Sequence, residues 1–119
     1  MSTTGTHDST IEGPAPAWVW PAIVVAAVAL TNAVPHTLAG PLVLNLPTPF
    51  SGGPGTLSGP MINFLWGLSN IALGVILLTP VRPWLHRRAV RVVLIVAAVA
   101  FATFLTWAIG SLPLPGRFA

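Results

Sequence analysis

His36 has the widest chemical scope of any side chain in the apolar parts of this sequence. It stands at the end of an apolar run, in the segment TNAVPH at residues 31–36. An imidazole can hold a proton, a hydrogen bond or a metal ion. Asn32 lies four residues earlier, so both side chains would share one face of a helix. A histidine near a helix C-terminus also interacts favourably with the partial negative charge there. The sequence leaves both interpretations open, a ligand-binding group and a helix-end residue.

A second set of polar and small residues follows a helical spacing between residues 63 and 74. Asn63, Gly67, Asn70 and Gly74 occur at i, i+4, i+7 and i+11, with Trp66 beside them. On a helix they would form one narrow stripe. Small residues let membrane helices approach closely, and amides hydrogen-bond across helices. The stripe therefore predicts a helix-packing seam at Gly67 and Gly74, with a polar lining for a ligand or ion path as the alternative.

Expected depth in the membrane brings these polar residues together. With a rise of about 1.5 Å per residue, most of them fall in the outer half of their spans, and Asn70 and Thr103 fall nearer the middle. The predicted polar cluster consists of Asn32, His36, Asn63, Trp66, Asn70, Thr103 and Thr106.

Other chemistries lack the residues that they need. The chain has no cysteine, which excludes disulfides, thiol nucleophiles and cysteine-held metals. Its only acids are Asp8 and Glu12, so no span contains a carboxylate for acid–base catalysis or a proton relay. His7, His36 and His86 do not all fall on one side of the membrane and cannot gather round one metal ion. We therefore predict no enzymatic activity, no metal and no cofactor.

The elements that must position these residues are membrane-spanning helices. Hydrophobic residues make up 54% of the chain and charged residues only 6%, with a mean hydropathy of +0.83. A soluble domain has about a quarter charged residues. Three apolar runs each approach the ~20 residues that cross a bilayer. The sequence predicts an all-α membrane protein, a three-transmembrane-helix bundle over residues 17–110, with spans of about 17–37, 60–79 and 86–110.

Prolines and tails bound these spans. Pro60 suits the first position of a helix. Thr79 and Pro80 predict the end of the second span, because the residue before a proline avoids the α region. Residues 1–16 are predicted to be a disordered N-terminal tail, and residues 111–119 a short C-terminal tail. We expect the first run to remain as a helix rather than to be a cleaved signal peptide, because acids and no basic residues precede it.

The charges predict an orientation. All five basic residues are arginines, and four of them lie in or beside the connection between the second and third spans. By the positive-inside rule this connection is cytoplasmic, so the N-terminus is inside and the C-terminus outside. The outer loop, residues 37–59, contains no charged residue. The absence of lysine and the Ala, Val, Pro, Gly and Arg bias favour a bacterial inner (plasma) membrane. No basic surface for nucleic acid is formed.

Three short motifs carry a resemblance. N-x-V-P-H-x-x-x-G at 32–40, P-T-P-F at 47–50 and S-x-x-x-x-N-x-x-W-G at 58–67 resemble a group of uncharacterised small bacterial multi-pass membrane proteins. The resemblance covers about residues 20–75. It implies a shared arrangement of the first two helices with their outer loop, and it implies no activity, substrate or cofactor.

Two functions from different classes fit this sequence. The first is association through helices, as a homo-oligomer or as an accessory subunit of a membrane complex, for which the Gly67 and Gly74 seam would supply a surface. The second is binding or transport of a small neutral or anionic solute, or of a lipid headgroup, by the polar cluster. In either case the expected partners are the lipid bilayer and other membrane subunits or a second copy of the chain.

Overall fold

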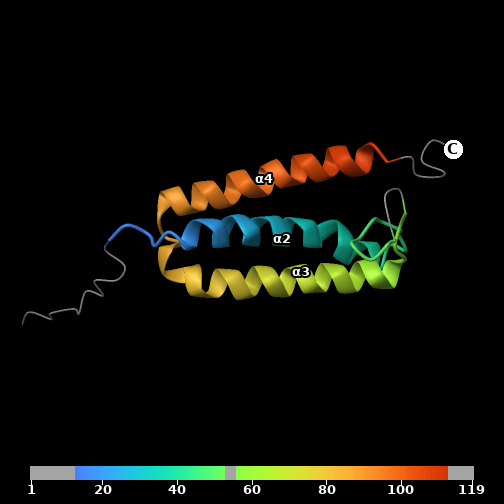
Figure 1. Ribbon diagram of the computed structural model, residues 1–119, viewed down its shortest axis with the longest axis horizontal. Coiled ribbons are helices and arrows are strands. Elements are labelled where there is room, and N and C mark those ends of the chain that lie inside the picture. The colour runs from blue at the N-terminus through green and yellow to red at the C-terminus, as the bar shows by residue number, and fades with distance from the viewer. Residues whose placement is uncertain (1–12, 53–55, 113–119) are drawn as a thin grey trace, which may run out of the picture.

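The computed structural model describes residues 13–52 and 56–112, and the chain is all-α there (Figure 1). The long helices are α2 (Val19–Ala39), α3 (Pro60–Val81) and α4 (Arg88–Gly110), and a 3₁₀ turn, η1 (Arg82–Trp84), follows α3. α2 lies between α3 and α4 and packs against both, whereas α3 and α4 barely touch each other. The predicted fold class is confirmed: three long apolar helices pack together as candidate transmembrane spans. The predicted tails lie mostly outside the described residues, at 1–12 and 113–119.

The two ends of the bundle differ in character. At one end, which we call the loop end, residues 40–59 connect α2 to α3. At the other, which we call the arginine end, η1 and the residues after it connect α3 to α4 and carry Arg82 and Arg87, and Arg88 begins α4. Among the described residues there is no acid, so no carboxylate of this part of the chain neutralises those arginines.

Prolines lie inside two helices instead of ending them. Pro35 is within α2, and α3 continues through Pro80 to Val81, two residues beyond the end predicted at Thr79. A proline removes only one intrahelical hydrogen bond. In the last turn of α3 that loss is small, and the chain changes direction only at η1, where Pro83 follows Arg82.

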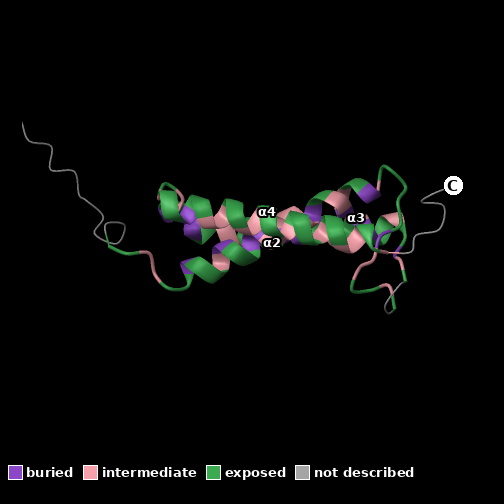
Figure 2. Ribbon diagram, turned by 90° about the horizontal axis from the view of Figure 1, so that it is seen from above, coloured by how far each residue is buried: buried purple, intermediate pink, exposed green. Residues whose placement is uncertain are grey.

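Burial and apolar character run in opposite directions through the three helices. Mean hydropathy over the most apolar stretch rises from 1.7 in Val19–Ala39 to 1.9 in Pro60–Trp84 and 2.5 in Arg88–Gly110. The buried share of those stretches falls from 39% to 22% to 0%. Figure 2 colours the buried residues purple, and most of those in the helices belong to α2 and α3. In water the most apolar helix would be the most buried, so the surface of α4 suits lipid.

The predicted packing seam is used within the chain, between α2 and α3. A Cβ built on Gly67 would lie 2.5 Å from the backbone nitrogen of Thr37, and a Cβ built on Gly74 would lie 2.5 Å from a methyl carbon of Leu30. At position 67 a Cβ would meet backbone atoms, so only glycine permits this separation of the two helices, whereas at position 74 it would meet the side chain of Leu30.

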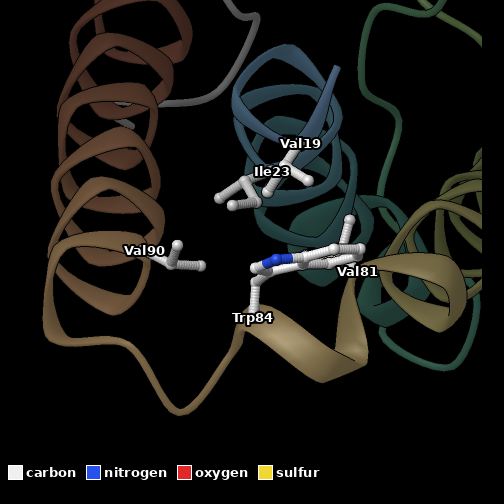
Figure 3. Close-up of a cluster of buried hydrophobic side chains, with 5 residues drawn as sticks. All are labelled: Val19, Ile23, Val81, Trp84 and Val90. Atoms are coloured by element: carbon white, nitrogen blue, oxygen red, sulfur yellow. The ribbon is translucent and has the colours of Figure 1, made fainter. Parts of the chain in front are cut away.

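A cluster of buried apolar side chains joins all three helices at the arginine end (Figure 3). Its members are Val19 and Ile23 of α2, Val81 of α3, Trp84 of η1 and Val90 of α4. The indole of Trp84 also meets that of Trp18 edge to face, with ring centroids 5.6 Å apart. From this anchored end α4 diverges from α2 toward the loop end (Figure 1).

Candidate binding site at the loop end

Hydrogen bonds tie the described parts of the connection between α2 and α3 to the helix ends. The backbone N–H of Leu44 donates to the carbonyl of Ala39 at 2.9 Å, beside Val43, whose φ of 54° is left-handed. Farther along, the N–H of Ser58 donates to the carbonyl of Leu46 at 2.9 Å and forms an isolated antiparallel bridge. The hydroxyls of Thr48 and Ser58 lie 2.6 Å apart and share a hydrogen bond. The two sides of the loop are thus fastened together at its base.

Asn63 is the fully buried side chain on which this loop base rests. Its Nδ2 lies 2.8 Å from the carbonyl of Ser58, 3.0 Å from that of Gly59 and 3.2 Å from that of Leu46. Its Oδ1 lies 2.7 Å from Nδ1 of His36. Asn63 therefore connects both sides of the loop, the start of α3 and the last turn of α2.

His36 is buried, with only 5% of its surface exposed. Its bond to Asn63 shows that the imidazole faces across to α3 and does not cap the carbonyls that end its own helix. The Nε2 atom on the other side of the ring has no hydrogen-bond partner among residues 13–52 and 56–112. It is also not sealed from the surface, unlike the buried, unpartnered Oγ1 of Thr37.

A second pair of side chains makes a similar contact farther into the bundle, about one turn along α2 and two turns along α3. Nδ2 of Asn32 on α2 donates to Oδ1 of Asn70 on α3 at 3.4 Å, a long hydrogen bond. Nδ2 of Asn70 in turn donates to the carbonyl of Trp66 at 2.8 Å. The i, i+4 spacings of Asn32 with His36 and the i, i+7 spacing of Asn63 with Asn70 thus bring two polar pairs into register between α2 and α3.

An open cavity of about 360 Å³ lies beside these pairs, where α4 diverges from α2. Its polar wall comes from four side chains, Asn32, His36, Thr48 and Trp66. Its apolar wall comes from Pro47, Pro49, Leu105, Ala108, Ile109 and Leu112. Trp66 is held by an edge-to-face contact with Phe50, whose ring centroid is 5.7 Å away. A concave, mainly apolar space with a few fixed polar groups is the usual form of a small-molecule site.

The structure brings together five members of the predicted polar cluster and leaves two apart. Asn32, His36, Asn63, Trp66 and Asn70 lie at this site. Thr103 and Thr106 are exposed on α4, where their hydroxyls donate to the carbonyls of Val99 and Ala102, each at 2.8 Å. A threonine in a helix commonly donates its hydroxyl hydrogen to the carbonyl four residues earlier in this way. Thr106 lines a neighbouring space with Thr31 and Pro35, not the cavity beside His36.

Residues of the loop complete the site, and the helical pattern did not include them. Thr48 lines the cavity, and the backbone carbonyls of Leu46 and Ser58 hold Asn63. The sequence held one signal for these residues: an uncharged loop that connects two helices, each with a polar face. Within residues 13–52 and 56–112 no three potential metal ligands of the His, Asp, Glu and Cys types lie together.

Comparisons with known proteins give no relative. No protein-family model matches the chain, and no curated protein and no solved structure matches it. The residues themselves carry the assignment: three apolar helices of membrane-spanning length, of which the most apolar is the least buried, make this chain a small multi-pass membrane protein.

Proposed function

We propose that this membrane protein binds a small molecule, either a solute or the head of a lipid, in the cavity at the loop end. The observation that carries the proposal is Nε2 of His36, which lacks a partner in the described part of the chain and belongs to a residue that lines the cavity. A polar atom in a membrane-embedded wall costs free energy unless something pairs with it. A bound molecule would supply that partner.

The polar side chains of the cavity wall are held in place by hydrogen bonds to residues behind them. His36 is held by Asn63, and Asn63 is held by carbonyls at the base of the loop. Groups fixed in this way keep the geometry that binding requires. The arginine cluster on the opposite end supports an orientation in which the loop end and its cavity face the outside of a bacterial plasma membrane.

Substitutions of His36 test the proposal with native mass spectrometry of the protein released from nanodiscs. An asparagine at position 36 keeps an amide N–H that can donate to Asn63 and removes Nε2, so His36→Asn separates the two roles of the imidazole. We expect molecules retained by the wild type to be lost from His36→Asn with assembly intact. His86→Ala, at an exposed histidine of the arginine end, is the matched control and should retain them. Equal retention by His36→Asn would remove His36 from the site.

Association is the second candidate function, and the exposed side of α4 favours it. Phe101, Phe104 and Trp107 form a row of rings, with centroids 5.9 Å apart for the first pair and 6.2 Å for the second. Phe104 is 52% exposed and Trp107 67% exposed. The Gly67 and Gly74 seam is occupied inside the chain, so a homo-oligomer or an accessory subunit would use α4 instead. A strictly monomeric particle without partners, purified in a mild detergent from its own membrane, would exclude this candidate.

A further inference from the structure

We propose that the cavity at the loop end selects its ligand through hydrogen-bond donors, and that the ligand is an uncharged, mainly apolar compound bearing hydroxyl groups. This inference rests on the binding function proposed above and specifies its ligand class. The argument starts on α3, where the direction of each hydrogen bond is decided.

The amide of Asn63 can be oriented in only one way. Three carbonyl oxygens surround one end of it, and a carbonyl can only accept a hydrogen bond, so that end must be Nδ2. The other end, Oδ1, faces His36 and must receive a hydrogen. His36 therefore carries its hydrogen on Nδ1. A neutral imidazole has only one ring N–H, which leaves a lone pair on Nε2.

The amide of Asn70 imposes the same direction on Asn32. Nδ2 of Asn70 donates to the carbonyl of Trp66, so its Oδ1 faces α2 and accepts from Nδ2 of Asn32. Oδ1 of Asn32 is then the free end of that amide, and no described residue donates to it. His36 donates its one ring N–H to α3, and Asn32 donates one of its two amide hydrogens there, so each side chain keeps an acceptor: Nε2 of His36 and Oδ1 of Asn32.

The rest of the wall fixes the charge and the polarity of the ligand. None of the residues that line the cavity is charged, and Pro47 and Pro49 lack a backbone N–H. The hydroxyl of Thr48 already shares a hydrogen bond with that of Ser58 and accepts one from the N–H of Phe50. An anion would meet these two lone pairs and no positive charge, because the donors that Asn32 and Trp66 bring to the wall are neutral N–H groups. An apolar body with hydroxyl groups would meet α4 side chains and two acceptors about one helical turn apart.

A series of three probes with one scaffold tests this ligand class on the protein in phosphatidylcholine nanodiscs. The probes are 4-propylphenol, its methyl ether 4-propylanisole and the anion 4-propylbenzoate, titrated with ¹⁵N-histidine-labelled protein. We expect wild-type His36 to show the Nδ1–H tautomer, and the phenol to shift its Nε2 resonance. One hydrogen bond predicts that the phenol binds about tenfold more tightly than the ether, with the benzoate weaker still.

His36→Asn is the matched variant, because it keeps a donor to Asn63 and deletes the Nε2 acceptor. In it the preference for the phenol over the ether should shrink, because Oδ1 of Asn32 remains and the new amide oxygen does not reach the position of Nε2. Adding diacylglycerol, whose head is a hydroxyl group, identifies the source of the ligand: competition with the phenol indicates a lipid, and lack of competition indicates a free solute.

Other outcomes overturn the inference in distinguishable ways. The cavity does not select hydrogen-bond donors if His36 carries its hydrogen on Nε2, if the ether binds as tightly as the phenol, or if the benzoate binds more tightly than both. If that binding disappears when Ala108→Trp fills the cavity, the proposed function survives without this ligand class. If none of the three probes and no diacylglycerol binds the wild type, both the ligand class and the proposed function are refuted.

Discussion

Replacing Asn63 with leucine, a side chain of similar size, should be among the most destabilising single changes at the loop end. The carbonyls of Leu46 and Gly59 would keep a partner, because the N–H of Ser58 and the N–H of Asn63 itself also donate to them. The carbonyl of Ser58 and Nδ1 of His36 would lose the only hydrogen bond that each makes in the described chain. Each buried group left unpaired costs about 1–3 kcal/mol, so we expect Asn63→Leu to lower the free energy of unfolding by about 2–6 kcal/mol.

Asn70→Leu is the matched control about two turns farther along α3. It removes one long hydrogen bond to Asn32, and the carbonyl of Trp66 retains its helical partner. We expect a loss of about 1 kcal/mol. Reversible unfolding in mixed micelles, titrated with sodium dodecyl sulfate and followed by tryptophan fluorescence, measures both variants. If Asn63→Leu costs no more than Asn70→Leu, Asn63 does not fasten the loop to the helices as described.

Three further changes probe the fold. Gly67→Ala places a Cβ against the backbone of Thr37 and should lower the free energy of unfolding by about 1–3 kcal/mol in the same assay. Gly59→Ala is its control and should be near neutral, because no atom lies within 4 Å of the new Cβ. Val43→Gly should stabilise the protein by up to about 1 kcal/mol, because Val43 adopts a φ of 54° and is 75% exposed; a destabilised variant would refute that reasoning. Single cysteines in this cysteine-free chain test the orientation. A membrane-impermeant thiol reagent should label Ser51→Cys on intact cells and should label His86→Cys only after the cells are permeabilised. The reverse labelling pattern would show that the orientation is inverted.

Helical spacing was sufficient to predict which faces of α2 and α3 carry the polar and small residues, but not that these two faces meet within one chain. In a helix, residues at i, i+4, i+7 and i+11 share a face whatever surrounds them. The stripe from Asn63 to Gly74 therefore had to lie on one side of α3, and the glycines made that side the one that another helix could approach. The same reasoning placed His36 and Asn32 together on α2.

Spacing could not show what each polar side chain bonds to. The hydroxyls of Thr103 and Thr106 donate to carbonyls of their own helix, so these residues lie outside the cluster although their depth in the span is similar. Asn63 bonds mainly to backbone carbonyls of the loop, which every residue type presents, so no pattern of side chains signals them. The helix that continues past Pro80 reflects how little one missing hydrogen bond matters in a last turn.

The fastening of the loop base bears on the entropy of binding. Asn63 and the Leu46–Ser58 bridge fix the backbone directly before the rim that Pro47, Thr48 and Pro49 form, and hydrogen bonds between Thr48 and Ser51 fix it directly after. The two prolines restrict that backbone further, because their rings lock φ. A binding loop that a ligand must first order loses about 0.5–1.5 kcal/mol for each side chain immobilised. At this rim the ordering entropy of the loop is lost when the chain folds, so a bound ligand does not have to offset it again.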